Sequence, residues 1–282
     1  MLAEEQQKSP LGQTQRERFQ QDGFVMENDI FSLSEVETLR QACAAPEDRQ
    51  WETADQTIHS LGITARHPAF LALARDPRIV ERLIPLLGPD IQLQHSKLAA
   101  QATQKGKGGF GWHQDFAFFP HTNMDLIAVM VMLDDATPDN GCMRMVRGSH
   151  RLGLLNHAND KGLFTGSCQE RIWEAQPENV APVTPRVGGI SIHHCLTVHG
   201  SGPNPSGMPR RGIVFQYRAD DAYQLADSVW ADTGLLISGQ RREHVRCEAA
   251  TLRLPRSTRD PAQPFGGAWN QKGTFACHED GP

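Results

Sequence analysis

The chain has 282 residues, a formal net charge of −5 and 39% hydrophobic residues. This length allows a substantial core, and the acidic balance argues against a nucleic-acid-binding surface. The sequence contains no run of 18 apolar residues, so no membrane span is expected. Its polar, acidic start is unlike a signal peptide, and its six cysteines lack C-x-x-C pairing, as is typical of reduced thiols. We therefore expect a cytoplasmic protein without nucleic-acid or membrane partners, and its oligomeric state is left open.

Helices are predicted in the first third of the chain. Residues 15–21 are expected to form a short helix. Residues 34–37, Ser-Glu-Val-Glu, have the pattern of a capping box that opens a second helix. Asp76-Pro77 is typical of the start of a third. Together these elements predict an N-terminal helical layer at about 14–88.

From Ile91 onward the pattern changes to short strands separated by turns rich in Pro, Asp, Asn and Gly. The predicted strands are 91–103, 110–116, 126–133, 142–146, 188–194 and 211–218. Helices followed by many short strands favour a mainly β fold, with a helical layer packed on a jelly roll at about 91–218. Residues 151–182 are predicted to be an insertion or a lid over its open end, and residues 219–282 to wrap its outside. We see no repeat or linker and predict a single domain over 1–282.

A metal-ligand pattern lies in the segment Gly111-Trp112-His113-Gln114-Asp115-Phe116. Side chains two apart on a strand face the same way, so His113 and Asp115 can bind one metal together. His199 would complete a two-histidine, one-carboxylate triad, the arrangement associated with non-haem Fe(II) oxygen chemistry. Zinc accepts the same residue types, so the triad alone does not name the metal. The apolar surroundings strengthen the metal hypothesis, because a buried carboxylate needs a partner.

Four motifs, in chain order, resemble the phytanoyl-CoA dioxygenase family, whose members depend on Fe(II) and 2-oxoglutarate. They are Phe19-Gln20-Gln21-Asp22-Gly23-Phe24-Val25; His113-Gln114-Asp115 with Ala117-Phe118-Phe119-Pro120; Leu133-Asp134-Asp135 with Asn140-Gly141-Cys142 and Arg147-Gly148-Ser149-His150; and His199-Gly200-Ser201 with Pro209-Arg210-Arg211. Arg147 departs from the family, which usually has proline in this structural turn, and the tail after about Ala219 matches only loosely. The resemblance implies a double-stranded β-helix, cupin-like, in which His113, Asp115 and His199 bind Fe(II). It also implies 2-oxoglutarate as co-substrate and O2 as oxidant.

The resemblance further assigns contacts to 2-oxoglutarate. In the family, the arginine at the position of Arg210 holds the distal carboxylate, which a guanidinium matches with two hydrogen bonds. Arg211 competes for this role, because neighbours on a strand face opposite ways and only one can point inward. Comparison with the family favours Arg210. Ser201 is a second candidate contact, and Lys97 is a weaker third.

The implied activity is hydroxylation of an unactivated C–H bond, with release of succinate and CO2. Phe110, Trp112, Phe116 and Phe118 suggest a pocket for a small, largely apolar molecule, such as a secondary metabolite or lipid. The sequence does not identify the substrate, nor does it decide between hydroxylation, desaturation and ring formation. Asp115 disfavours halogenation, because related halogenases lack this carboxylate. Two alternatives stay open: a metal-dependent jelly-roll isomerase or hydrolase that does not use 2-oxoglutarate, and a non-catalytic ligand-binding jelly roll.

Other histidines and arginines have plainer interpretations. His193 and His194 are expected to pack or hydrogen-bond inside the barrel, and one of them can orient a metal ligand. His121 and His150 are expected to be hydrogen-bonded loop residues. The pair at 241–242, Arg-Arg, is interpreted as solvated surface in preference to a substrate contact.

Overall fold

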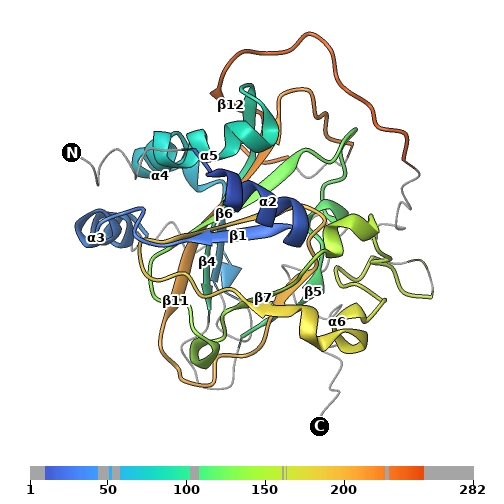
Figure 1. Cartoon of the computed structure of the whole chain (residues 1–282). Coiled ribbons are helices and arrows are strands. Elements are labelled where there is room, and N and C mark those ends of the chain that lie inside the picture. The colour runs from blue at the N-terminus through green and yellow to red at the C-terminus, as the bar shows by residue number, and fades with distance from the viewer. Residues whose placement is uncertain are drawn as a thin grey trace.

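Two antiparallel sheets form the centre of the protein, and helices pack on the outer face of the larger sheet (Figure 1). The computed structural model describes residues 10–43, 60–101, 108–160, 162, 164–225 and 229–250, together with the backbone of 51–52 and 58–59. Among these residues, no helix is both long enough and apolar enough to cross a membrane.

The larger sheet has the strand order β1-β9-β6-β11-β4-β3-β2, with β12 added beside β4. Its strands are β1 (Phe24–Glu27), β2 (Trp51–Glu52), β3 (Ile58–Leu61), β4 (Ile91–Gln101), β6 (Leu126–Met132), β9 (Ile190–His194), β11 (Arg210–Ala219) and β12 (Leu235–Ser238). The smaller sheet has the order β5-β10-β7-β8, from β5 (Phe110–His113), β7 (Met143–Val146), β8 (Val180–Pro182) and β10 (His199–Ser201). Two facing antiparallel sheets of this kind form a jelly roll. The predicted fold class is confirmed.

Side-chain alternation along β11 separates the main core from an internal cavity. Ile213, Phe215 and Tyr217 belong to the main hydrophobic cluster, which also contains the apolar faces of the helices. Val214 and Gln216, which alternate with these residues in the sequence, line a cavity bounded by both sheets. Successive strand residues point to opposite faces, so one strand serves both surfaces.

The predicted helical layer consists of α2 (Gln13–Asp22), α3 (Leu33–Ala42), α4 (Pro68–Ala74) and α5 (Pro77–Leu87). α5 begins where predicted, with Asp76 as its N-cap and Pro77 in its first turn. α4 was not predicted, because its seven residues are too few to show a clear helical period.

The capping box of α3 lies two residues before the predicted one. Ser32 is the N-cap, and its hydroxyl accepts a hydrogen bond from the backbone N–H of Glu35, whose side chain bonds back to the backbone N–H of Ser32. Ser34 with Glu37 has the same spacing as Ser32 with Glu35, so the sequence pattern fits both registers. The structure selects the earlier one.

Glu35 also forms an ion pair with Arg78. We expect this pair to stabilise the folded protein at neutral pH and to lose that effect in acid. The Arg78 side chain lies 2.7 Å from Glu35 Oε1, and this hydrogen bond lowers the pKa of Glu35 from 4.5 to about 2. A lowered folded-state pKa contributes stability above the unfolded value that is lost as the pH falls from about 4.5 towards 2. We expect Glu35→Gln to be less stable than wild type at pH 7, by no more than about 1 kcal/mol because the pair is partly exposed. Urea unfolding at pH 7 and pH 3 should show this gap narrowing in acid; a gap that widens would contradict the pairing.

The strand predictions are right for the long strands and incomplete for the short ones. Predicted strand 110–116 is too long, because β5 ends at His113 and a 3-10 helix, η3 (Asp115–Ala117), follows. The prediction omitted β1, β2, β3, β8, β10 and β12, each four residues long or shorter. So few residues show no visible alternation.

Of the two predicted roles of residues 151–182, the described residues of this segment fit an insertion and not a lid. The described part packs on the outer face of the smaller sheet, where Trp173 of α6 (Ile172–Ala175) stacks on Trp112 with ring centroids 5.0 Å apart. Cys168 joins Val146 and Val198 in the same apolar cluster. The segment therefore covers the back of the smaller sheet.

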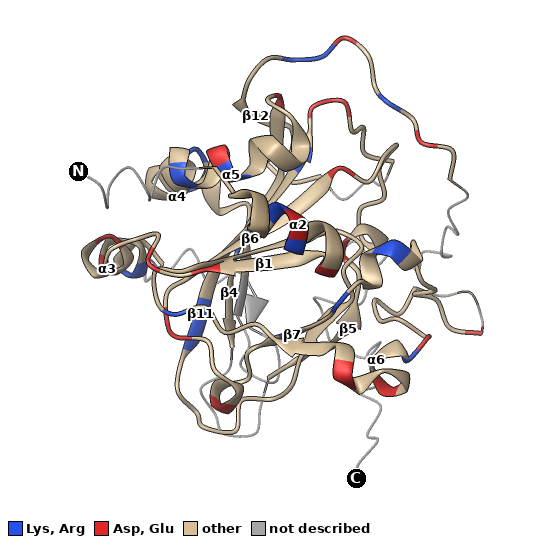
Figure 2. Cartoon of the chain, in the orientation of Figure 1, with Lys and Arg blue, Asp and Glu red and all other residues tan. Residues whose placement is uncertain are grey.

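The described part of the tail consists of β12 and an ion-paired stretch that Figure 2 shows with alternating basic and acidic residues. Arg242 pairs with Asp90 and Arg241 with Asp220, which supports the surface interpretation of both arginines. Residues 251–282 lie outside the described part, so the wrap over 219–282 and the single domain over 1–282 stay predictions.

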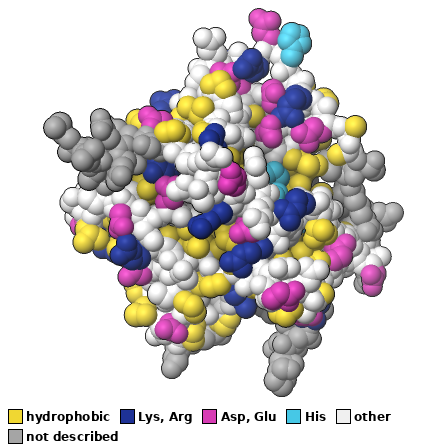
Figure 3. Space-filling model, in the orientation of Figure 1, with side chains coloured by type: hydrophobic (Ala, Val, Ile, Leu, Met, Phe, Trp, Pro, Cys, Tyr) yellow, Lys and Arg dark blue, Asp and Glu magenta, His cyan; other side chains and the backbone are white. Residues whose placement is uncertain are grey.

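On the face shown in Figure 3, basic and acidic side chains are interspersed among the described residues. This face carries no continuous basic stripe.

Candidate metal centre

His113 and His199 come together because they are partners across two neighbouring strands. His113 is the last residue of β5, His199 is the first residue of β10, and their Cα atoms are directly paired in the smaller sheet. Opposed residues of an antiparallel pair project from the same face. Their ring centroids are accordingly 4.2 Å apart, with both side chains buried.

Asp115 joins the two histidines from the turn that follows β5. Its Oδ1 lies 3.7 Å from Nε2 of His113 and 3.7 Å from Nε2 of His199. One ligand atom from each residue lies within 4.8 Å of the others. The expectation that His113 and Asp115 share one strand face was wrong, because Asp115 opens the 3-10 helix η3. That turn nevertheless brings the carboxylate to the imidazoles.

Gln114, the residue between His113 and Asp115, holds this turn in place through hydrogen bonds. Its buried side chain donates hydrogen bonds to the carbonyl oxygens of Leu196, at 2.7 Å, and Gly153, at 2.8 Å. Its amide oxygen accepts one from the backbone N–H of Leu155. The turn is therefore tied both to the loop before β10 and to the segment behind the smaller sheet.

Both histidines present Nε2 to the site. His113 Nδ1 donates to the carbonyl oxygen of Gly111, at 2.7 Å, and His199 Nδ1 donates to that of Thr197, at 2.9 Å. A carbonyl only accepts, so the proton lies on Nδ1 and the Nε2 lone pair is offered to a metal. Burial holds the pKa of His199 well below its usual value, which keeps the ring neutral, as metal binding requires.

The second oxygen of Asp115 is held by two residues of the larger sheet. His193 Nε2 lies 3.1 Å from Oδ2, and Gln216 Nε2 donates to the same atom at 2.5 Å. Oδ2 is thereby occupied, and Oδ1 is left facing the histidines. Of the two histidines expected to pack or hydrogen-bond inside the barrel, His193 is the one that contacts Asp115, so its role in orienting a ligand stays a prediction. His194 instead lies beside His150 and accepts a hydrogen bond from the backbone N–H of Leu196.

Gln216 was not recognised in the sequence as part of the site. The available signal was a lone amide between two aromatic residues, Phe215 and Tyr217, in an otherwise apolar strand. A polar residue at an inward position of such a strand needs a buried partner.

Removing the Gln216 amide should weaken metal binding without unfolding the protein. We expect Gln216→Leu to bind Fe(II) roughly 10-fold more weakly, since partners of metal ligands typically contribute 10–100-fold and His193 still holds Oδ2. Anaerobic metal titration measures the change, and Gln101→Leu provides a matched amide-to-leucine control on the neighbouring strand. Equal iron affinity in Gln216→Leu and wild type would show that the hydrogen bond does not orient Asp115.

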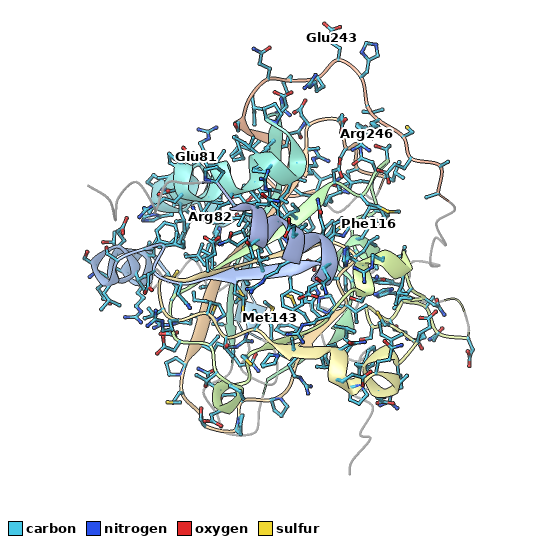
Figure 4. All side chains as sticks on the ribbon, in the orientation of Figure 1. Glu81, Arg82, Phe116, Met143, Glu243 and Arg246 are labelled. Atoms are coloured by element: carbon cyan, nitrogen blue, oxygen red, sulfur yellow. The ribbon has the colours of Figure 1, made fainter. Side chains whose placement is uncertain are left out.

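The triad opens into a cavity with about 510 Å³ of empty space, part of it open to solvent. The cavity walls come from both sheets: Lys97, Ala99, Phe110, Met130, Met143, His193, Gly200, Ser201, Arg210, Val214 and Gln216 line it beside the three triad residues. Figure 4 labels Met143 on this wall.

Arg210 and Ser201 lie in the cavity with hydrogen-bonding capacity to spare. Arg210 is 4% exposed and donates to Gln101 Oε1 at 3.0 Å, whereas its Nε and the Ser201 hydroxyl have no partner among the described residues. Burial lowers the pKa of Arg210 to about 10, so the guanidinium stays charged at neutral pH. A buried cation with unused donors suits a carboxylate ligand.

Arg211 points the other way. Its guanidinium forms two hydrogen bonds with Asp134, both at 2.8 Å, at the edge of the helical layer. The two arginines thus face opposite sides of β11, and it is Arg210 that lines the cavity.

Lys97 lies on β4 directly opposite Val214 of β11 and is also buried in the cavity wall. Burial lowers its pKa to about 8, partly offset by the negative charge of Asp115. The ammonium group is therefore mostly charged at neutral pH.

Three of the four aromatic residues predicted to line a substrate pocket do not do so. Phe110 lines the cavity, but Trp112 faces outward, onto Trp173. Phe116, labelled in Figure 4, and Phe118 are buried in a separate cluster. Trp112 lies in β5 next to inward-facing His113 and therefore faces the opposite side of the sheet. Phe116 and Phe118 follow the turn at Asp115, where the predicted strand has already ended.

His121 and His150 have the predicted loop roles. His121 donates to the carbonyl oxygen of Phe119 and meets Arg218 at its other nitrogen. His150 is bonded to the carbonyl oxygen of Gln20. Neither residue lines the described cavity.

The donor set of the site fits iron(II). Two neutral imidazole nitrogens and one carboxylate oxygen converge on one side, and a cavity lies on the other, so three coordination positions can face it. Zinc would accept the same three groups. Comparison with known proteins separates the two metals.

A family model described as phytanoyl-CoA dioxygenase matches residues 19–212, more than half of the chain. The chain belongs to the phytanoyl-CoA dioxygenase family. It is an iron- and 2-oxoglutarate-dependent dioxygenase with O2 as oxidant, as its relatives indicate.

One relative is a probable α-ketoglutarate-dependent hypophosphite dioxygenase from Stutzerimonas stutzeri, 33% identical over 189 residues; α-ketoglutarate is 2-oxoglutarate. The match covers 65% of this chain, and the chain spans just under two thirds of that relative, also 65%. An ectoine dioxygenase from Sphingopyxis alaskensis is 27% identical over 236 residues, covering 75% of this chain and 77% of its own. The iron-bound crystal structure of EctD from S. alaskensis superposes with a TM-score of 0.61 at 25% identity, covering 75% of this chain and 78% of its own.

Proposed function

We propose that His113, Asp115 and His199 bind the catalytic Fe(II), and that the enzyme hydroxylates a small molecule in the cavity beside it. The observation that carries this proposal is the convergence of the triad, buried Arg210 and Ser201 on a single cavity. Hydroxylation consumes O2 and 2-oxoglutarate and yields succinate, CO2 and the hydroxylated substrate.

Arg210 and Ser201 hold the distal carboxylate of 2-oxoglutarate in this proposal. Both residues have donors without a partner among the described residues, and one carboxylate could accept hydrogen bonds from both. Gln101 on the neighbouring strand holds the guanidinium of Arg210 in place. Anchoring this end orients the 2-oxo acid end towards the triad. Positioning of this kind lowers the entropic cost of reaction.

The remaining residues of the cavity orient and shield the reacting groups. His193 and Gln216 hold Asp115 Oδ2, so that Oδ1 is presented to the metal. Ala99, Met130 and Val214 supply apolar walls that exclude water from the oxidising site. Iron, when bound, would activate O2, and these residues orient and shield the site for that reaction.

The substrate is proposed to be a small molecule. The relatives' names support this class, because hypophosphite and ectoine are both compact. The apolar walls fit the predicted apolar part of a substrate, although of the four proposed aromatic residues only Phe110 contributes.

Succinate formation tests the proposal. Protein loaded with Fe(II) should convert 2-oxoglutarate to succinate only when O2 is present, and an accepted substrate should accelerate the conversion. The matched control is protein loaded with Zn(II). Succinate at the no-enzyme level with iron, 2-oxoglutarate and O2 all present would contradict the proposal and favour an isomerase or hydrolase.

A further inference from the structure

Two inward positions of the larger sheet that carry little or no side chain lie next to Arg210. They are Ala99 of β4 and Gly212 of β11, which are paired across the two strands. Arg210, two residues before Gly212, is paired with Gln101 in the adjacent inward row. Residues two apart on a strand face the same side, so Ala99 and Gly212 leave space in the wall beside the arginine.

The side chain of Met130 fills the space over Gly212. Met130 is 4% exposed and lies on β6, opposite Val214 of β11. A Cβ atom on Gly212 would overlap Cε of Met130 and lie 2.9 Å from its Cγ. The φ angle of Gly212 is not positive, so its backbone would accept other residues. It is therefore the packing of the methionine, and not the backbone, that favours glycine here.

Met130 lies along the path proposed for 2-oxoglutarate. β11 presents Arg210 at one end of the cavity wall and Gln216, which donates to the carboxylate of the triad, further along the strand. Met130 lines the cavity opposite Val214, in the row between these two residues. Lys97, the weaker third candidate contact of 2-oxoglutarate, belongs to the same row. A 2-oxo acid held by Arg210 and by the metal must pass across this row.

We propose that Met130, packed over Gly212, limits the length of the 2-oxo acid that the enzyme accepts. The inference rests on the proposed function and deepens it, because it concerns the co-substrate of the same site. When both ends of the acid are held, an additional methylene group fits only if the chain bends towards a wall. On the larger sheet, the side chain of Met130 occupies that space. The cavity therefore selects 2-oxoglutarate over its longer homologue, 2-oxoadipate.

Equilibrium binding of the two acids tests this inference. Iron-loaded protein is titrated without O2 with each acid, and the ratio of the two dissociation constants is determined. We expect wild type to favour 2-oxoglutarate by roughly 10-fold or more, the usual effect of one extra methylene group in a filled pocket. Met130→Ala should reduce this preference to about twofold or less, because it opens space beside the chain.

Met132→Ala is the matched control for Met130→Ala. Met132 is the next inward residue of β6 and belongs to the same apolar cluster, but it does not line the described cavity. The same truncation at this position should therefore keep the wild-type ratio of the two dissociation constants. An equal change in both variants would show that loosened packing, and not the wall at Met130, sets the preference.

A second pair of variants tests the contact between Met130 and Gly212. In Gly212→Ala the methionine must move, and the cavity is free space that it already borders. We expect 2-oxoglutarate to bind roughly 10-fold more weakly, as overpacking of a filled interior is unfavourable. Combining Gly212→Ala with Met130→Ala should restore the affinity to within about threefold of Met130→Ala alone. Far-UV circular dichroism and the Tm of each variant separate a displaced methionine from loss of fold.

Four results would overturn the inference: equal affinity of wild type for the two acids, an unchanged preference in Met130→Ala, the same change in Met132→Ala, or a loss in Gly212→Ala that Met130→Ala does not restore. The comparison of Met130→Ala with Met132→Ala decides the matter even if Gly212→Ala does not fold. Failure of the proposed function is distinguishable from these results, because wild type would then bind neither acid.

Discussion

Replacing His113, Asp115 or His199 with alanine is expected to abolish iron-dependent conversion of 2-oxoglutarate to succinate. Each replacement removes one of the three proposed ligand atoms, which lie within 4.8 Å of one another. Residues that only hydrogen-bond to a metal ligand typically contribute roughly 10–100-fold to metal affinity. Loss of a ligand itself should therefore lower the affinity for iron by more than about 100-fold. Metal content after dialysis and succinate release measure the two effects.

His150→Ala is the matched control, since His150 is bonded to Gln20 outside the cavity. It should bind iron and form succinate like wild type. Far-UV circular dichroism of all four variants separates loss of metal from loss of fold. Wild-type turnover in any one of the three triad variants would contradict the ligand assignment.

The second large effect is expected for Arg210→Ala, which should weaken 2-oxoglutarate binding by roughly 100-fold. Truncating one partner of a buried, hydrogen-bonded charge pair costs 2–5 kcal/mol, and about 3 kcal/mol corresponds to this factor. Iron binding should be kept, because Arg210 is not a triad residue. Anaerobic titration of the iron-loaded variant with 2-oxoglutarate measures the dissociation constant for 2-oxoglutarate.

Arg211→Ala is the natural control for this prediction, since both changes remove a guanidinium from adjacent positions. Arg211 pairs with Asp134 on the other side of β11, so its loss should leave 2-oxoglutarate affinity within about twofold. If Arg211→Ala weakens binding and Arg210→Ala does not, the assignment of the clamp is wrong. If neither weakens it, a metal-dependent enzyme without 2-oxoglutarate becomes the better account.

The sequence was sufficient to predict the elements with strong local signals. Asp76-Pro77 begins α5 as predicted, and the long strands β4, β6 and β11 were recognised because alternation or unbroken apolar runs extend over seven residues or more. The short strand β10 was missed, although it carries His199. Its existence depends on pairing with β5 and β7, which no local pattern encodes.

For the site, the residue types were predictable but their geometry was not. His113, Asp115 and His199 were selected through the motif and the family resemblance, yet Asp115 reaches the histidines through a 3-10 turn. The same turn explains why Phe116 and Phe118 leave the cavity. Gln216 escaped notice because its importance arises only when β11 faces Asp115 across the two sheets.

The central claim is that the triad binds one ferrous ion, which then takes up 2-oxoglutarate. Anaerobic titration of metal-free protein with Fe(II), followed by 2-oxoglutarate, tests it most directly. We expect saturation at one iron per chain and a visible absorption band that forms only when 2-oxoglutarate is added, and we expect Asp115→Ala to show neither. Absence of the band in wild type, or its persistence in Asp115→Ala, would contradict the account.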